Sequence, residues 1–223
     1  MRTIQTMTSD LIMPDAVRVG HGLQENLFPS AILANMPKIK DIEPTPNPNA
    51  MKFVLKEPLI SIGSRSYERP SDAVGDPLAE ALFKIDHVDS VFYMDRFLTV
   101  AKSPFGNWDE LLPKLAVPIR EAPSAAESPM PPAAAGGDGA SAQPFVDDDD
   151  LLERINAVLD EKIRPGLAGD GGGLEIISLA DRRLTIRYQG ACGSCPSSIA
   201  GTLMAIENFL KTDVDPELEV VAL

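Results

Sequence analysis

The sequence predicts an α+β protein built from two small α/β domains joined by a flexible linker rich in Pro, Ala and Gly. The chain has 223 residues, 44% of them hydrophobic, which suffices for two cores near the lower size limit for stable domains. Residues 121–145 contain almost nothing to bury, so this segment cannot offset the entropy lost on ordering. On both sides of it, helical apolar stripes alternate with short apolar strands.

We therefore divide the chain into an irregular tail (1–43), an N-terminal domain (44–120), the linker (121–145) and a C-terminal domain (146–223). In the N-terminal domain, the sequence predicts a strand at about 50–56 and a helix near 76–85. Two strands should come next, "VDSVFYM" and "RFLTVAK", with a turn at Asp95–Arg96, and then a last helix that contains Trp108 and three leucines. No catalytic constellation is evident here.

The C-terminal domain should run helix–strand–strand–helix–strand, with a three-stranded sheet. "VDDDDLLERINAVLDEKI" is an amphipathic helix whose acidic start, Asp147–Asp150, caps the free N–H groups, and Pro165–Gly166 should end it. "LEIISLA" and "RLTIRYQG" read as antiparallel strands with a turn at Asp181–Arg182. A helix from Pro196 and a short final strand, "ELEVVAL", complete the domain.

Charge and hydropathy exclude several classes of protein. A net charge of −13 argues against binding of nucleic acid or of anionic membrane surfaces, and no apolar run is long enough to span a bilayer. The first 28 residues lack a secretory signal, and their acidic residues, Asp10, Asp15 and Glu25, make a poor mitochondrial presequence. We expect a cytoplasmic bacterial protein, with the mitochondrial matrix as second choice.

The only two cysteines, Cys192 and Cys195, lie where a strand should end and a helix begin. A helix N-terminus favours the thiolate that binds metals or attacks disulfides, and Gly190 and Gly193 let the backbone approach what the sulfurs hold. Two thiols separated by two residues make half of a soft-metal site. Neither histidine, His21 in the tail or His87 in the other domain, convincingly completes it.

Three functions fit this pair of thiols. A redox dithiol would act within one chain, but a thioredoxin-like fold needs further strands after its active-site helix. Zinc requires four ligands, and this chain offers two. An iron–sulfur cluster also requires four thiolates, which a symmetric dimer would supply about its two-fold axis. Spacing alone does not separate these three functions. The glycine-rich stretch 169–173 lacks the Lys-Ser/Thr of a phosphate loop.

The C-terminal domain resembles the C-terminal domain of the NifU family, the Nfu-type iron–sulfur scaffold and carrier proteins. The resemblance lies in the turn Asp170–Gly172, in Glu175 and in the segment "GACGSCPSS". The segments "PTPNPNAMKFVL", "SVFYMDRFLTV" and "NWDELLPKL" resemble the Nfu N-terminal domain. One departure is Gly173, where the family commonly has an acidic residue.

The resemblance implies a scaffold and carrier that is not an enzyme. Cys192 and Cys195 would bind a labile [4Fe–4S] cluster shared between two subunits, and the loaded homodimer would transfer it to apo iron–sulfur proteins. A [2Fe–2S] cluster or zinc could occupy the site in aerobic preparations. Cluster donors and clients are the implied partners, which the N-terminal domain would recognise. The alternative function is a thiol–disulfide oxidoreductase that uses the same dithiol.

Overall fold

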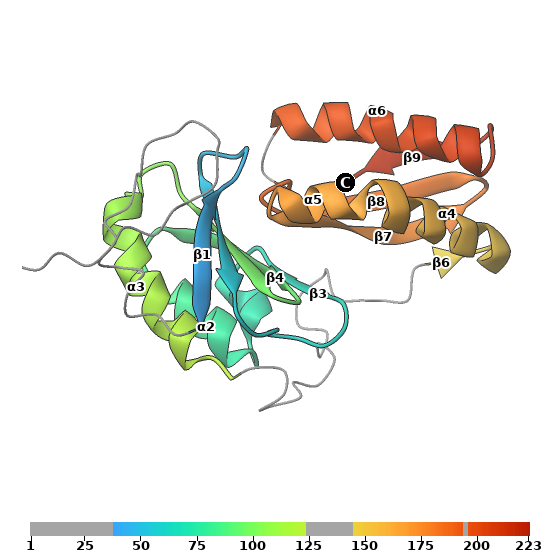
Figure 1. The fold of residues 1–223 in the computed structure, drawn as a ribbon. Coiled ribbons are helices and arrows are strands. Elements are labelled where there is room, and N and C mark those ends of the chain that lie inside the picture. Colours follow the sequence, from blue (N-terminus) through green and yellow to red (C-terminus); the bar gives the residue numbers. More distant parts are fainter. Residues whose placement is uncertain (1–37, 124–144, 194–195) are drawn as a thin grey trace, which may run out of the picture.

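The computed structural model describes residues 38–123, 145–193 and 196–223, apart from the side chains of Phe145 and of 196–200. Two α/β domains lie side by side, the N-terminal one in blue and green and the C-terminal one in orange and red (Figure 1). This arrangement confirms the predicted α+β class and the two domains. The tail 1–37 and most of the predicted linker, 124–144, lie outside the described residues.

The N-terminal domain is built on a five-stranded antiparallel sheet in the order β1-β2-β5-β4-β3. Its strands are β1 (Ile39–Pro44), β2 (Ala50–Leu55), β3 (Ser64–Tyr67), β4 (Val88–Met94) and β5 (Phe97–Lys102). Its helices are the 3-10 turn η1 (Pro70–Ala73), α2 (Pro77–Phe83) and α3 (Trp108–Glu121).

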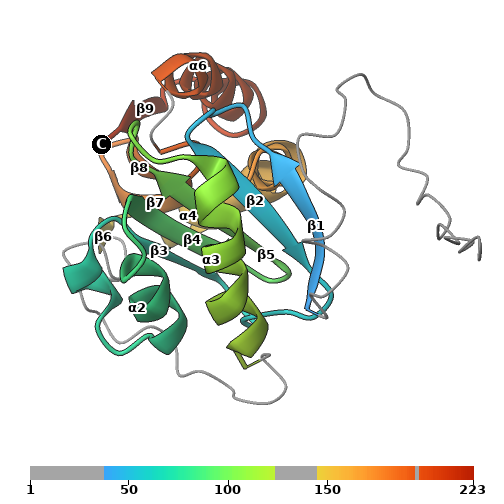
Figure 2. The same ribbon diagram turned by 90° about the vertical axis from the view of Figure 1, so that its left-hand side faces the viewer.

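Both helices α2 and α3 cover one face of this sheet, as the view in Figure 2 shows. Alternate residues of the central strands point toward them and form the core, among them Phe53, Tyr93 and Leu98, each fully buried. The sheet therefore separates its own helices from the C-terminal domain (Figures 1 and 2). Its second face is turned toward the C-terminal domain and not toward α2 and α3.

The C-terminal domain has a four-stranded sheet in the order β6-β7-β8-β9. Its elements are β6 (Phe145–Val146), α4 (Asp149–Lys162), α5 (Arg164–Gly169), β7 (Gly172–Ala180), β8 (Arg183–Gly190), α6 (Pro196–Asp213) and β9 (Glu219–Ala222). The apolar stripes of α4 and α6, with Ile155, Leu159, Ile206 and Leu210 fully buried, pack in one core with the leucines and isoleucines of β7 and β8.

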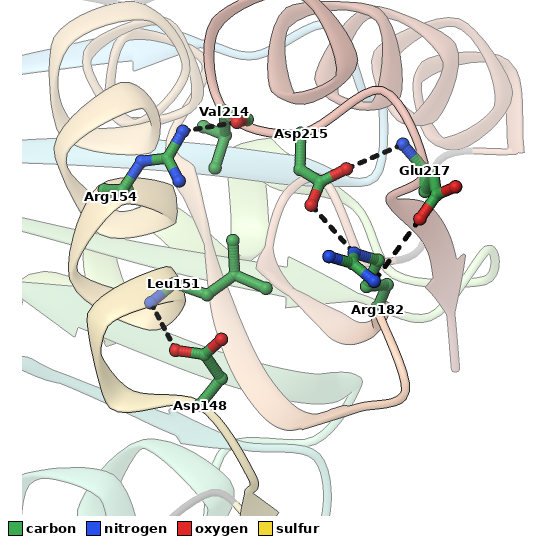
Figure 3. Close-up of polar contacts among 7 residues, drawn as sticks. All are labelled: Asp148, Leu151, Arg154, Arg182, Val214, Asp215 and Glu217. Carbon is green, nitrogen blue, oxygen red and sulfur yellow. Dashed lines mark hydrogen bonds and ion pairs between the residues drawn. The ribbon is translucent and has the colours of Figure 1, made fainter.

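Polar contacts fix the end of this domain that lies away from the cysteines (Figure 3). Asp148 accepts a hydrogen bond from the Leu151 N–H at 2.9 Å, which caps α4 as the acidic run predicted. Arg154 on α4 donates to the Val214 carbonyl after α6. Arg182, in the turn between β7 and β8, pairs with Asp215 at 2.8 Å. These contacts tie together α4, the hairpin turn and the segment that connects α6 to β9.

The main predicted elements and both predicted turns are present. Asp95 and the pair Asp181–Arg182 adopt positive φ, as tight hairpin turns require. Four details differ. The sheet of the C-terminal domain has four strands, because β6 adds a two-residue strand parallel to β7. Strands β1 and β3 were not predicted, and β1 begins before the predicted domain boundary at residue 44. α4 already ends at Lys162, and Pro165–Gly166, which were predicted to end it, lie in the first turn of the short helix α5.

Candidate metal centre

Cys192 is the second residue after β8, in a turn that leads toward α6. β8 ends at Gly190, whose φ of +65° is a conformation that side chains rarely adopt. The Gly193 N–H closes the turn by donating to the Gly190 carbonyl at 3.1 Å. Cys195 lies outside the described residues, and α6 begins directly after it. The predicted position between a strand and a helix thus holds for Cys192.

The Cys192 side chain is 5% exposed and lies against the glycine turn that precedes β7. A Cβ placed on Gly172 would lie 2.6 Å from Cys192 Sγ and 2.6 Å from the Gln189 carbonyl oxygen. Both distances are far below van der Waals contact, so only glycine fits at this position. Gly171, beside it, has a φ of +80°. The turn 170–172 is therefore a cradle shaped around the first cysteine, which explains why the two sequence features occur together.

A tyrosine hydroxyl lies buried in the same region. Tyr188 is 4% exposed, and its hydroxyl has no hydrogen-bond partner among the described residues. Burial and, to a smaller extent, the charge of Cys192 together raise the pKa of Tyr188 to about 12, so the phenol stays protonated at neutral pH. Cys192 and Tyr188 belong to the same buried cluster, so the one cysteine that the structure describes has apolar and aromatic surroundings. The donor set therefore fits a soft metal or an iron–sulfur cluster better than a hard cation.

Glu175 is placed by its neighbours in the sheet and not by the cysteine. It is half-buried, pairs with Arg187 at 3.9 Å and accepts a hydrogen bond from Gln189 at 3.2 Å. Burial raises the pKa of Glu175, although Arg187 and the Gln189 hydrogen bond oppose that rise. Gln189 follows Tyr188 in β8 and leads to the cysteine turn. Glu175 thus holds the side chain of Gln189, three residues before Cys192.

His87, the one histidine in the described part of the chain, does not complete the centre. His87 is exposed in the N-terminal domain, where its Nδ1 lies 3.1 Å from Ser103 Oγ, and His21 lies outside the described residues. Within the ranges that the structure describes, no three His, Cys, Asp or Glu side chains converge as a metal site would require. The N-terminal domain does reach the cysteine turn through Asn47, whose amide donates to the Ala191 carbonyl at 3.2 Å. Sequence reasoning missed this residue.

Two family profiles match the chain. The one described as the scaffold protein Nfu/NifU N-terminal domain matches residues 39–125, and the NifU-like domain matches residues 155–221. Both matches coincide with the two domains of the structure, and the second includes the cysteine turn. The fold and the cysteine turn thus define a two-domain protein of the scaffold class that these profiles describe. The chain belongs to the Nfu/NifU scaffold family.

Curated relatives agree with this assignment. NifU-like protein 4, mitochondrial, from Arabidopsis thaliana is 34% identical over 74% of this chain and 59% of its own length. The human NFU1 iron-sulfur cluster scaffold homolog, mitochondrial, is 33% identical over 79% of this chain and 68% of its own length. The chain thus spans about three fifths to two thirds of these relatives. A crystal structure of a Staphylococcus aureus protein is 32% identical over 36% of this chain and 96% of its own, with a TM-score of 0.33.

The expectation of a cytoplasmic bacterial protein is wrong. The curated relatives from plants, insects and human are named as mitochondrial proteins, so the similarity is to a mitochondrial type of scaffold. The expectation rested on the acidic residues of the first 28 positions, and the charge of a tail is a weak guide to where a folded protein acts. No helix in the described part of the chain is long and apolar enough to cross a membrane.

Proposed function

We propose that this protein is an iron–sulfur cluster carrier that binds a labile [4Fe–4S] cluster through Cys192 and Cys195. The observation that carries the proposal is the cradle at Gly172, where a Cβ would lie 2.6 Å from Cys192 Sγ. A backbone turn shaped around one cysteine is an arrangement for presenting that sulfur in a fixed place. The family assignment supplies the cargo, since its members are described as scaffold proteins and the human relative is named for iron–sulfur clusters.

The cluster is shared between two copies of the chain. A [4Fe–4S] cluster needs four thiolates and each chain has two cysteines, so a two-fold axis through the cluster supplies the full set. The loaded form is a homodimer, and separation of the two copies removes half of the ligands at once. This makes the cluster easy to release, which suits a carrier.

Transfer is an exchange of ligands. Each iron–thiolate bond to the carrier breaks as a thiolate of the client forms its own bond to the same iron. The oxidation states of iron and sulfide do not change, and the protons that the client thiols release pass through water to the released cysteines. Only S–H bonds and bonds to iron are exchanged, so the protein acts as a carrier and not as an enzyme. Cluster donors and apo iron–sulfur proteins are its partners.

The N-terminal domain contributes recognition of donors or clients, with the segment after residue 123 as the tether to the cluster domain. Tethering raises the effective concentration of the cluster near a bound client without any new contact. Deleting residues 1–120 should leave iron binding intact and slow transfer to a client. An unchanged transfer rate would remove this role.

Anaerobic reconstitution with iron and sulfide tests the proposal. We expect about two iron per chain, a broad absorbance band in the visible-blue and loss of both in Cys192→Ser. His87→Ala, which removes an exposed metal-ligating side chain of the other domain, is the matched control and should bind iron normally. A colourless monomer with a reversible Cys192–Cys195 disulfide would instead indicate a thiol–disulfide oxidoreductase.

A further inference from the structure

The central strand β5 of the N-terminal sheet is buried on both faces, although the helices of the domain cover only one face of the sheet (Figure 2). All six residues of β5 are buried. Leu98 and Val100 belong to the core under the helices, whereas Thr99 and Ala101 point to the other face. On that face Phe92 of β4 lies opposite Thr99 and is 1% exposed. An apolar second face requires a cover.

The cover is the glycine turn of the C-terminal domain. A Cβ on Gly171 would lie 3.0 Å from Thr99 Oγ1, and one on Gly173 would lie 3.1 Å from the Phe92 ring. A Cβ on Gly190 would lie 2.7 Å from the same ring. Three glycines that flank the cysteine therefore open the space that Phe92 and Thr99 fill.

Ala191, the residue before the cysteine, completes the fit. It packs with Ala50 and Ala101 in a small apolar cluster that spans both domains, and it is 2% exposed. Asn47 donates to its carbonyl at 3.2 Å. The N-terminal domain therefore contacts both the side chain and the carbonyl of Ala191. The backbone next to Cys192 is held in place by residues outside its own domain.

Polar contacts border this apolar centre. Ser64 Oγ donates to Gln189 Oε1 at 3.0 Å, and Lys52 Nζ donates to the Gly169 carbonyl at 3.1 Å. Beside Gly193 the contact opens into a cleft of about 420 Å³, lined in part by Glu68, Asp89 and Lys102. A small apolar centre with a polar, partly open border is typical of a reversible contact between domains, not of a permanent one.

We propose that the N-terminal domain is an intramolecular cap on the cysteine turn, and that it must undock before Cys192 can enter a centre shared with a second copy of the chain. In the docked form the N-terminal domain covers Ala191, the neighbour of Cys192, whereas Cys192 itself is 5% exposed and packs in the core of its own domain. A second chain therefore cannot reach the cysteine turn from the side that the N-terminal domain occupies. Both domains are on one chain, which favours docking even through a small surface. The docking stands on these contacts alone, whereas its consequence for loading rests on the proposed cluster-binding function.

The docking is tested on the full-length apo-protein by ¹⁵N relaxation. If the cap is docked, the amides of both domains report one shared rotational correlation time. Phe92→Ala should separate the domains. Truncating a buried aromatic at an interface lowers the ratio of docked to undocked molecules roughly 30-fold, which corresponds to about 2 kcal/mol. Phe92 lies outside the core under the helices, so its domain should stay folded. Gly173→Glu disrupts the same contact from the C-terminal domain. It tests the docking even if Phe92→Ala fails to fold.

Phe105→Ala is the matched control, since Phe105 is 88% exposed in the same domain and should leave the shared correlation time unchanged. Two correlation times in the wild-type apo-protein would overturn the docking, whatever the cysteines bind. Loading with iron and sulfide is the second arm. Phe92→Ala and Gly173→Glu should load about tenfold faster or more, and equal loading rates in all variants would overturn the capping role while leaving cluster binding intact.

Discussion

Gly172→Ala is the substitution that tests the cradle around Cys192 most sharply. The added Cβ would lie 2.6 Å from Cys192 Sγ and 2.6 Å from the Gln189 carbonyl oxygen. The sulfur could rotate away, but the carbonyl belongs to the backbone of β8, so the strand and the turn must separate. Overpacking of this kind costs roughly 1–3 kcal/mol. The first cysteine should also lose its position, so we expect less iron after reconstitution.

The stability of the C-terminal domain is best followed by itself. Urea unfolding monitored on the amide resonances of β7 and β8 does this, since a two-domain chain need not unfold in one step. Gly166→Ala is the control, because a Cβ at this helical position would meet nothing within 4 Å. That variant should stabilise the domain by about 0.5–1 kcal/mol and bind iron like the wild type. If Gly172→Ala were as stable as Gly166→Ala and bound as much iron, the cradle would have no role.

Three further predictions concern the two cores. Asp76→Ala should destabilise the N-terminal domain by roughly 3 kcal/mol, measured by Trp108 fluorescence in urea, because Asp76 is 3% exposed and accepts hydrogen bonds from the hydroxyls of Tyr67 and Tyr93. Asp148→Ala should cost the C-terminal domain about 1 kcal/mol through loss of the α4 cap, seen as an earlier urea midpoint in its amide resonances. Burial raises the pKa of Glu175, so its contribution to stability is fully present below the unfolded value and is lost as the pH rises through the folded one. Glu175→Gln should therefore be slightly more stable than the wild type at about pH 8 and not at about pH 4, and a constant difference in melting temperature across that range would contradict this.

The parts of the fold that depend on local pattern could be predicted. The stripes of α4 and α6, the hairpin turns at Asp95 and Asp181, and the cap at Asp148 each depend on residues close together in the chain. β1 could not be predicted, because a register shift between Ile39 and Asp41 breaks the alternation of buried and exposed residues. β3 is short and polar, and β6 is too short to carry a pattern.

The site was predictable in its chemistry and not in its surroundings. The thiol pair and the glycine turn are motifs that can be recognised in the sequence, but their contact joins residues 172 and 192 and needs the pairing of β7 with β8. The contacts of Asn47 and Phe92 with the C-terminal domain join residues that are even farther apart in the sequence. One signal was available. β5, "FLTVAK", is apolar at nearly every position, which indicates a strand that is covered on both faces.

Native mass spectrometry of the anaerobically reconstituted full-length protein would show whether two copies of the chain share one cluster. We expect a species of twice the 24.0 kDa of one chain plus the mass of a single [4Fe–4S] cluster, which Cys192→Ser abolishes. A monomer that carries a complete cluster, or a dimer that forms equally well without iron and sulfide in the Cys192→Ser variant, would contradict a cluster held between two copies.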